Sequence, residues 1–139
     1  GGAAPEAVEA LERYGLHVGI AFQIMDDVLD YSSNEREFGK TICKDVQEGS
    51  ITLPLIAALR SCPPEDRAAM TALLTAHDHS PEELARIAGL IETHGGNAYA
   101  RAQAQVHIAA AIKALAMFAD DPQRQWLVDI AHYVGERTF

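Results

Sequence analysis

Three aspartates in one short stretch are the residues of this chain best suited to chemistry. Asp26, Asp27 and Asp30 lie in the run 19–31. At the helical period they and Gln23 fall within an arc of about 100°, and Asp26 and Asp30 are one turn, or about 6 Å, apart. No basic side chain in the run relieves their repulsion, whereas Mg²⁺ binds carboxylates and bridges them to phosphates. The spacing is compatible with a magnesium–diphosphate site, although a bare D-D-x-x-D is more often a solvated acidic helix face.

A long helix must position these carboxylates. Pro5 suits a first helical turn, and we expect one helix over residues 5–31. The side facing away from the aspartates is apolar: Ile20, Ala21, Phe22, Ile24, Met25, Val28 and Leu29. An apolar stripe should precede it at Val8, Leu11 and Leu16. Gly15 and Gly19 would weaken a helix, so we expect close approach there by another helix or by a substrate chain, the first being the commoner use.

A glycine- and lysine-containing loop is predicted after this helix, over residues 32–50, with one possible helical turn at 34–38. Lys40 could give a metal-bound diphosphate its complementary charge. Gly49 should allow a turn closed to other residues. Thr52 is a candidate N-cap for the next helix, with Pro54 near its start.

The order of these motifs resembles the trans-isoprenyl (polyprenyl) diphosphate synthases. F-Q-x-x-D-D-x-x-D, then G-K, then D-x-x-x-G, then T-L-P-L-I is similar to the second aspartate-rich motif of that family and the loop that follows it. The resemblance continues weakly to Tyr133-Val134-x-x-Arg137. It implies the all-α isoprenoid synthase fold, a helical bundle, with Mg²⁺ as cofactor.

The resemblance also implies roles for individual residues. Asp26 would be a magnesium ligand, with Asp27 and Asp30 binding metal-held waters or shaping the site. Lys40 would contact the allylic diphosphate, and Gln23 and Phe22 would help to bind substrate. Two positions depart from the family: Ser50 replaces a usual lysine, and Cys43 a usual glycine. Loss of one charge-assisted phosphate contact would cost about 1.5–3 kcal/mol of diphosphate binding.

Composition narrows the class of protein. The chain has 139 residues, 48% of them hydrophobic, enough for one domain with a modest core. Its net charge of −9 argues against nucleic acid as a partner. No run is long enough to span a bilayer. Two cysteines are too few for a disulfide framework, so a cytoplasmic setting is the default.

The rest of the chain is also predicted to be helical. Helices are expected over residues 52–60, 64–76, 81–94, 97–119 and 122–135, with a capping box at Ser80 and Glu83 and a break at Gly95-Gly96. Trp126 and Tyr133 are expected in the core. The result is a single all-α domain, or the C-terminal half of a larger bundle, because the family's first aspartate-rich motif has no counterpart here.

By resemblance, the expected activity is prenyl transfer from an allylic diphosphate to isopentenyl diphosphate, with the chain dimeric or associated with an N-terminal half. One alternative is a non-catalytic subunit of the same fold, which Ser50 and Cys43 favour. A terpene cyclase or squalene-type synthase is a weaker alternative, and a purely structural bundle would leave the loop unexplained.

Overall fold

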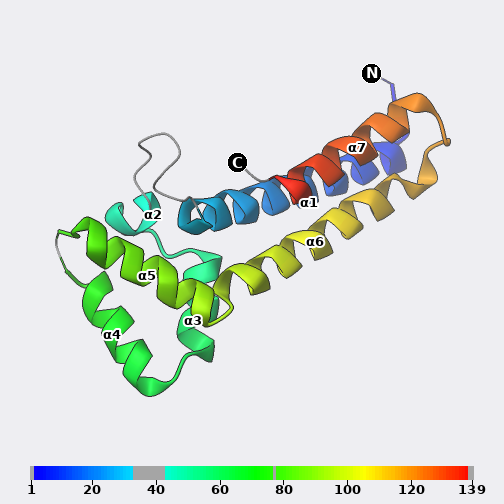
Figure 1. The fold of residues 1–139 in the computed structure, drawn as a ribbon. Helices are drawn as coiled ribbons and strands as arrows, with labels where there is room; N and C mark the ends of the chain where they lie inside the picture. Colours follow the sequence, from blue (N-terminus) through cyan, green and yellow to red (C-terminus); the bar gives the residue numbers. More distant parts are fainter. Residues whose placement is uncertain (1, 33–42, 77, 138–139) are drawn as a thin grey trace. The chain divides into compact units, whose positions relative to one another are not determined.

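The computed structural model describes residues 2–32, 43–76 and 78–137, which form helices and no strand (Figure 1). The α-helices are α1 (Pro5–Ser32), α2 (Lys44–Gln47), α3 (Leu53–Ser61), α4 (Pro64–Leu74), α5 (Pro81–Thr93), α6 (Gly96–Ala114) and α7 (Pro122–Glu136). A 3₁₀ turn at Leu115–Met117 follows α6. Within the described ranges, no helix combines the length and apolar character that crossing a membrane requires. The predicted all-α class is confirmed.

The helices fall into two compact units. In the described residues, the first unit is 2–25 with 101–137, and the second is 26–32, 43–76 and 78–100. Each division lies inside a helix, α1 in one case and α6 in the other. The acidic residues that end α1 therefore belong to the second unit.

The first unit is built from α1, α6 and α7. The Tyr14 hydroxyl donates to the Leu127 carbonyl over 2.8 Å, which joins α1 to α7. The Nδ1 atoms of His17 and His107 lie 2.9 Å apart, which joins α1 to α6. Small buried residues allow this close packing, namely Ala10, Ala21, Ala104, Ala111 and Ala131. The core of this unit therefore depends more on alanines than on the larger apolar side chains of the predicted stripe.

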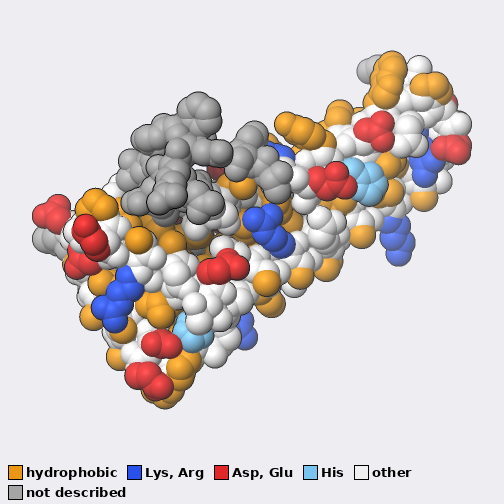
Figure 2. All heavy atoms as spheres, viewed as in Figure 1, with side chains coloured by type: hydrophobic (Ala, Val, Ile, Leu, Met, Phe, Trp, Pro, Cys, Tyr) orange, Lys and Arg blue, Asp and Glu red, His pale blue; other side chains and the backbone are white. Residues whose placement is uncertain are grey.

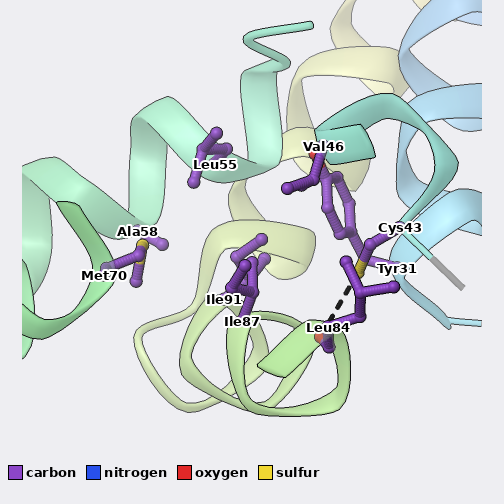
Figure 3. Close-up of a cluster of buried hydrophobic side chains, with 9 residues drawn as sticks. All are labelled: Tyr31, Cys43, Val46, Leu55, Ala58, Met70, Leu84, Ile87 and Ile91. Atoms are coloured by element: carbon purple, nitrogen blue, oxygen red, sulfur yellow. Dashed lines mark hydrogen bonds between the residues drawn. The ribbon is translucent and has the colours of Figure 1, made fainter. Parts of the chain in front are cut away.

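The second unit packs α2, α3, α4 and α5 around one apolar cluster (Figure 3). Its buried members are Tyr31, Cys43, Val46, Leu55, Ala58, Met70, Leu84, Ile87 and Ile91. Tyr31 comes from the last turn of α1 and Val46 from α2, so the cluster joins the end of α1 to the helices that follow it. The core of the second unit thereby fixes the segment that carries the acidic residues.

The helix starts followed the predicted signals closely. Ser80 and Glu83 form the expected capping box: the Ser80 amide donates to Glu83 Oε2 over 2.8 Å, and the Glu83 amide donates to Ser80 Oγ over 3.3 Å. α6 is shorter than predicted because the chain tightens into the 3₁₀ turn at residue 115. α2 was not predicted at all. The predicted turn at 34–38 lies outside the described residues.

Gly96 is required where α6 begins. A Cβ atom there would lie 2.3 Å from the Pro54 carbonyl oxygen and 2.9 Å from Ile91 Cγ2. Gly15 and Gly19 are different, because a Cβ at either would meet nothing within 4 Å among the described residues. No helix among the described residues therefore approaches α1 closely at these two glycines, contrary to the commoner of the two predicted uses, and the substrate-chain alternative stays a prediction.

Candidate functional site

The last three turns of α1 have the two faces that the sequence predicted. Met25 and Val28 are buried, at 1% and 0% exposure. On the other face Asp26 is exposed, and Asp27 and Asp30 are half-buried. The helical period therefore separates a packed side from an acidic side, and it places the carboxylates where a ligand can reach them.

Phe22 does not belong to the buried side as predicted. Its side chain is 45% exposed, and the Arg137 guanidinium carbon lies 4.4 Å from its ring centroid. A cation over an aromatic face is attracted to the ring. This contact ties the C-terminal end of α7 to α1 within the first unit, and it shows what Arg137 touches in this structure.

Asp30 holds the start of α2. Its Oδ1 accepts from the Lys44 amide and its Oδ2 from the Asp45 amide, each over 3.1 Å. Its main-chain carbonyl accepts from the Cys43 amide over 3.2 Å. The first amides of a helix have no partner within the helix, and here a side chain from another helix provides the acceptors.

Asp45 joins the acidic side, which the sequence analysis did not anticipate. Burial raises the pKa of the Asp45 carboxyl, and the charges of Asp30 and Asp27 raise it further. Burial also raises the pKa of Asp30, opposed by its amide hydrogen bonds and reinforced by Asp26 and Asp27. The aspartates of α1 and α2 therefore repel one another. The sequence signal that could have placed Asp45 among them is the D-x-x-x-G motif, which begins at Asp45 and ends at Gly49.

Cys43 occupies a backbone conformation that favours glycine. Its φ is +57° and its ψ 42°, in the left-handed region. The side chain is fully buried and its Sγ lies 3.5 Å from the Leu84 carbonyl oxygen (Figure 3). Burial raises the pKa of the thiol to about 12. The cysteine is therefore a packed core residue rather than a reactive one, and the family's usual glycine has a conformational reason.

Thr52 holds the predicted N-cap position of α3, but its side chain makes no capping hydrogen bond there. Its Oγ1 lies 2.7 Å from the Tyr31 hydroxyl, and both residues are buried. Burial raises the pKa of Tyr31 well above its ordinary value. This hydrogen bond fixes the end of α1 against the start of α3. It thereby helps to position the last turns of α1, which carry the acidic residues.

Three positions after α1 bear on the positive charge near the acidic residues, namely Lys40, Lys44 and Ser50. Lys40 lies outside the described residues. Lys44 Nζ is 3.1 Å from Glu48 Oε1 in an exposed ion pair, which raises the lysine pKa. Ser50 is exposed and its amide donates to the Asp45 carbonyl over 2.8 Å. Position 50 therefore offers a neutral hydroxyl group where the resemblance gives a lysine as the family's usual residue.

The carboxylates suit a hard divalent cation by their chemistry. Burial first, and then repulsion between neighbouring carboxylates, raises the pKa values of Asp30 and Asp45, and a bound divalent cation would relieve that repulsion. Across residues 2–32, 43–76 and 78–137, however, no three histidine, cysteine, aspartate or glutamate side chains converge as a complete ligand set.

The sequence profile of the polyprenyl synthetase family matches residues 1–91. The chain belongs to this family. It is 36% identical over 137 residues to a short chain isoprenyl diphosphate synthase of Methanothermobacter thermautotrophicus, and 38% identical over 136 residues to a nonaprenyl diphosphate synthase of Mycobacterium tuberculosis. These matches cover 99% and 98% of this chain but 42% and 40% of the relatives.

Solved structures of polyprenyl synthetases have the same fold. A polyprenyl synthase from Caulobacter crescentus, complexed with calcium and isoprenyl diphosphate, matches with a TM-score of 0.89 and 31% identity. A decaprenyl diphosphate synthase from Rhodobacter capsulatus matches with a TM-score of 0.86 and 38% identity. Each match covers 98% of this polyprenyl synthetase chain and 42% of the solved chain. The predicted isoprenoid synthase fold and family are confirmed.

Proposed function

We propose that this chain provides the allylic-diphosphate side of a Mg²⁺-dependent polyprenyl diphosphate synthase. Such an enzyme elongates an allylic diphosphate with isopentenyl diphosphate. The observation that carries the proposal is the acidic end of α1, with Asp26 exposed and Asp27 half-buried beside it, in a chain of this family. The names of the relatives, which are isoprenyl and polyprenyl diphosphate synthases, support the substrate class.

Each site residue has a role in this proposal. Asp26 and Asp27 hold Mg²⁺, which supplies positive charge to the diphosphate as it departs. Gln23 lies one turn earlier on the same helix face and orients the diphosphate or its waters by hydrogen bonding. Lys40 adds a positive charge, and Phe22 contacts substrate. The working assembly is a dimer or a complex with the rest of a synthase fold, in the cytoplasm.

Calorimetric titration of the 139-residue chain with geranyl diphosphate tests this assignment. We expect binding that requires Mg²⁺ and that Asp26→Asn weakens by at least about tenfold, because a metal-bridged diphosphate contact is lost. Asp78→Asn is the matched control, since it removes one carboxylate from an exposed position in the same unit. Equal weakening by both variants, or binding without Mg²⁺, would contradict the proposal.

A non-catalytic subunit of the same fold is the second candidate. Cys43 in a left-handed conformation and neutral Ser50 favour it, since both depart from the family pattern as the resemblance gives it. A subunit of this kind keeps the helical packing but not the ligand. Absence of Mg²⁺-dependent geranyl diphosphate binding, in a chain that melts cooperatively, would favour this candidate over the first.

A further inference from the structure

Two histidines join α1 to α6 in the first unit. The Nδ1 atoms of His17 and His107 lie 2.9 Å apart, although 90 residues separate the two histidines in the chain. The ring planes are tilted by 45°, and the ring centroids are 5.1 Å apart. The centroid separation exceeds the nitrogen–nitrogen distance by about two ring radii, so the two nitrogens face each other nearly head-on. This is the geometry of a hydrogen bond between the rings, not of stacking.

The space between the two nitrogens holds a single proton. In a neutral imidazole one nitrogen donates and the other accepts, whereas in an imidazolium both nitrogens donate. One ring must therefore donate through Nδ1 while the other accepts there. The pair keeps its hydrogen bond when it is neutral and when it carries one positive charge. Two imidazolium rings would set two donors and two positive charges against each other, and the contact would be lost.

The charged side chains beside the pair on α1 and α6 add positive charge. Arg13, one turn before His17, and Lys113 line the same hollow as His17. The carboxylate of Glu9 lies 3.4 Å from the Arg13 guanidinium in an exposed ion pair. The surroundings on these two helices therefore favour a pair with no more than one positive charge.

α7, the third helix of this unit, brings uncharged side chains inward. Its buried residues are Ala131 and Val134. The titratable side chains next to them along the helix are exposed, where water and salt screen their charges: Asp129, His132 and Glu136. α7 therefore does little to offset a second positive charge on the two histidines.

Acid should open this contact. An imidazole in water takes up a proton as the pH falls through about 6.5. Below that range an unfolded chain carries one added proton on each histidine, whereas the closed pair carries at most one in total. Stability falls with falling pH wherever the unfolded state binds more protons. A difference of one proton increases the open fraction by up to about tenfold for each pH unit.

We propose that His17 and His107 form an acid-labile clamp, which holds α1 to α6 within the first unit while the pair is neutral or singly charged and opens when both rings become imidazolium. α1 is the helix whose last turns carry the candidate site. The clamp makes the support of its earlier turns depend on pH. It is independent of the proposed prenyl transfer.

Nitrogen NMR of the full chain, without metal or substrate, tests the shared proton. At about pH 8.0 we expect a scalar coupling between the two Nδ1 nuclei across the hydrogen bond, with one nucleus protonated and the other not. At about pH 5.5 the coupling should be lost, and both rings should show imidazolium shifts. Rings that only pack together give no such coupling. Its absence at the higher pH, or its persistence at the lower pH, overturns the proposal.

Urea unfolding between about pH 8.0 and pH 5.5 tests the consequence for stability. Glutamine at position 17 can still donate to His107 but takes up no proton. We therefore expect the unfolding constant of the parent to rise relative to that of His17→Gln by about tenfold over this range. His132→Gln removes an exposed histidine of the same unit and should track the parent within about threefold.

The carboxylates of the second unit titrate in all three chains, so their effect cancels in these ratios. Equal pH dependence of the parent and His17→Gln overturns the clamp, and so does an equal change in His132→Gln. If His17→Gln does not fold, the coupling measured on the parent decides.

Discussion

At the scale of single residues, Cys43 shows how one substitution can be accommodated at a structural cost. A non-glycine residue in the left-handed region costs about 1–2 kcal/mol. The buried side chain recovers part of this through packing in the cluster of the second unit. The sequence analysis noted Cys43 as a departure from the family's usual glycine. The φ of +57° explains why glycine suits this position.

Comparing Cys43→Gly with Cys43→Ala isolates the backbone strain. Both variants lose Sγ, but only glycine relieves the left-handed conformation, so we expect Cys43→Gly to be more stable than Cys43→Ala by about 1 kcal/mol. The control is Ala68→Gly in the interior of α4, where glycine should be less stable by about 1 kcal/mol. Urea unfolding measures both differences, and the same sign at the two positions would refute the strain.

Asp45 should make stability depend on pH in a defined direction. Burial and neighbouring carboxylates raise its folded-state pKa above the ordinary 3.8, so the carboxyl favours folding when protonated. This contribution is present below pH 3.8 and is lost as the pH rises through the folded-state pKa. We therefore expect Asp45→Asn to unfold at higher urea than the parent at pH 7, with the advantage disappearing toward pH 3.5. An advantage that is constant with pH would argue against this origin.

At the scale of helices, the sequence was informative where local rules decide the structure. Ser80-Pro81 and the capping-box glutamate placed the start of α5. α2 was missed because the acceptors for its Lys44 and Asp45 amides come from the Asp30 side chain, 14 and 15 residues earlier, and no local pattern shows them. Thr52 holds the N-cap position that its local pattern predicts, but its hydroxyl bonds to Tyr31, 21 residues away, instead of capping the helix. Long-range partners therefore explain why α2 was missed and why the Thr52 side chain does not cap α3.

Two glycines of the second unit should respond in opposite ways to alanine, because only Gly96 lies close to another helix. Gly96→Ala should destabilise the second unit by about 1–3 kcal/mol, because its Cβ would lie 2.3 Å from the Pro54 carbonyl oxygen. Gly89→Ala, in the interior of α5 with nothing within 4 Å of its Cβ, should stabilise by up to about 1 kcal/mol. Thermal unfolding compares the two, and a neutral Gly96→Ala would show that this approach is not close in solution.

At the scale of the whole molecule, large apolar side chains remain on the surface. On α7, Trp126 is 63%, Ile130 50% and Tyr133 66% exposed, at a spacing that puts them on one helix face. Trp126 and Tyr133 were predicted to lie in the core, and their exposure corrects that prediction. Figure 2 also shows hydrophobic side chains at the surface of the first unit. Apolar surface of this kind marks interaction sites.

The exposed face of α7 should therefore drive association. We expect the chain to sediment as a dimer or larger species at tens of micromolar, and the double variant Trp126→Lys with Tyr133→Lys to shift it toward the monomer. Tyr99→Lys, which replaces a 49% exposed tyrosine in the other unit, is the control. A parent chain that sediments as a monomer and binds no hydrophobic dye would exclude this role.

Thermal unfolding with Mg²⁺ and geranyl diphosphate, each alone and together, tests the central claim most directly. If the acidic end of α1 binds a metal-bridged diphosphate, the melting temperature should rise with both together well beyond the sum of their separate effects. Asp26→Ala should remove that joint rise while leaving helicity unchanged. A joint rise that survives in Asp26→Ala, or no joint rise in the parent, would contradict the site assigned to these aspartates.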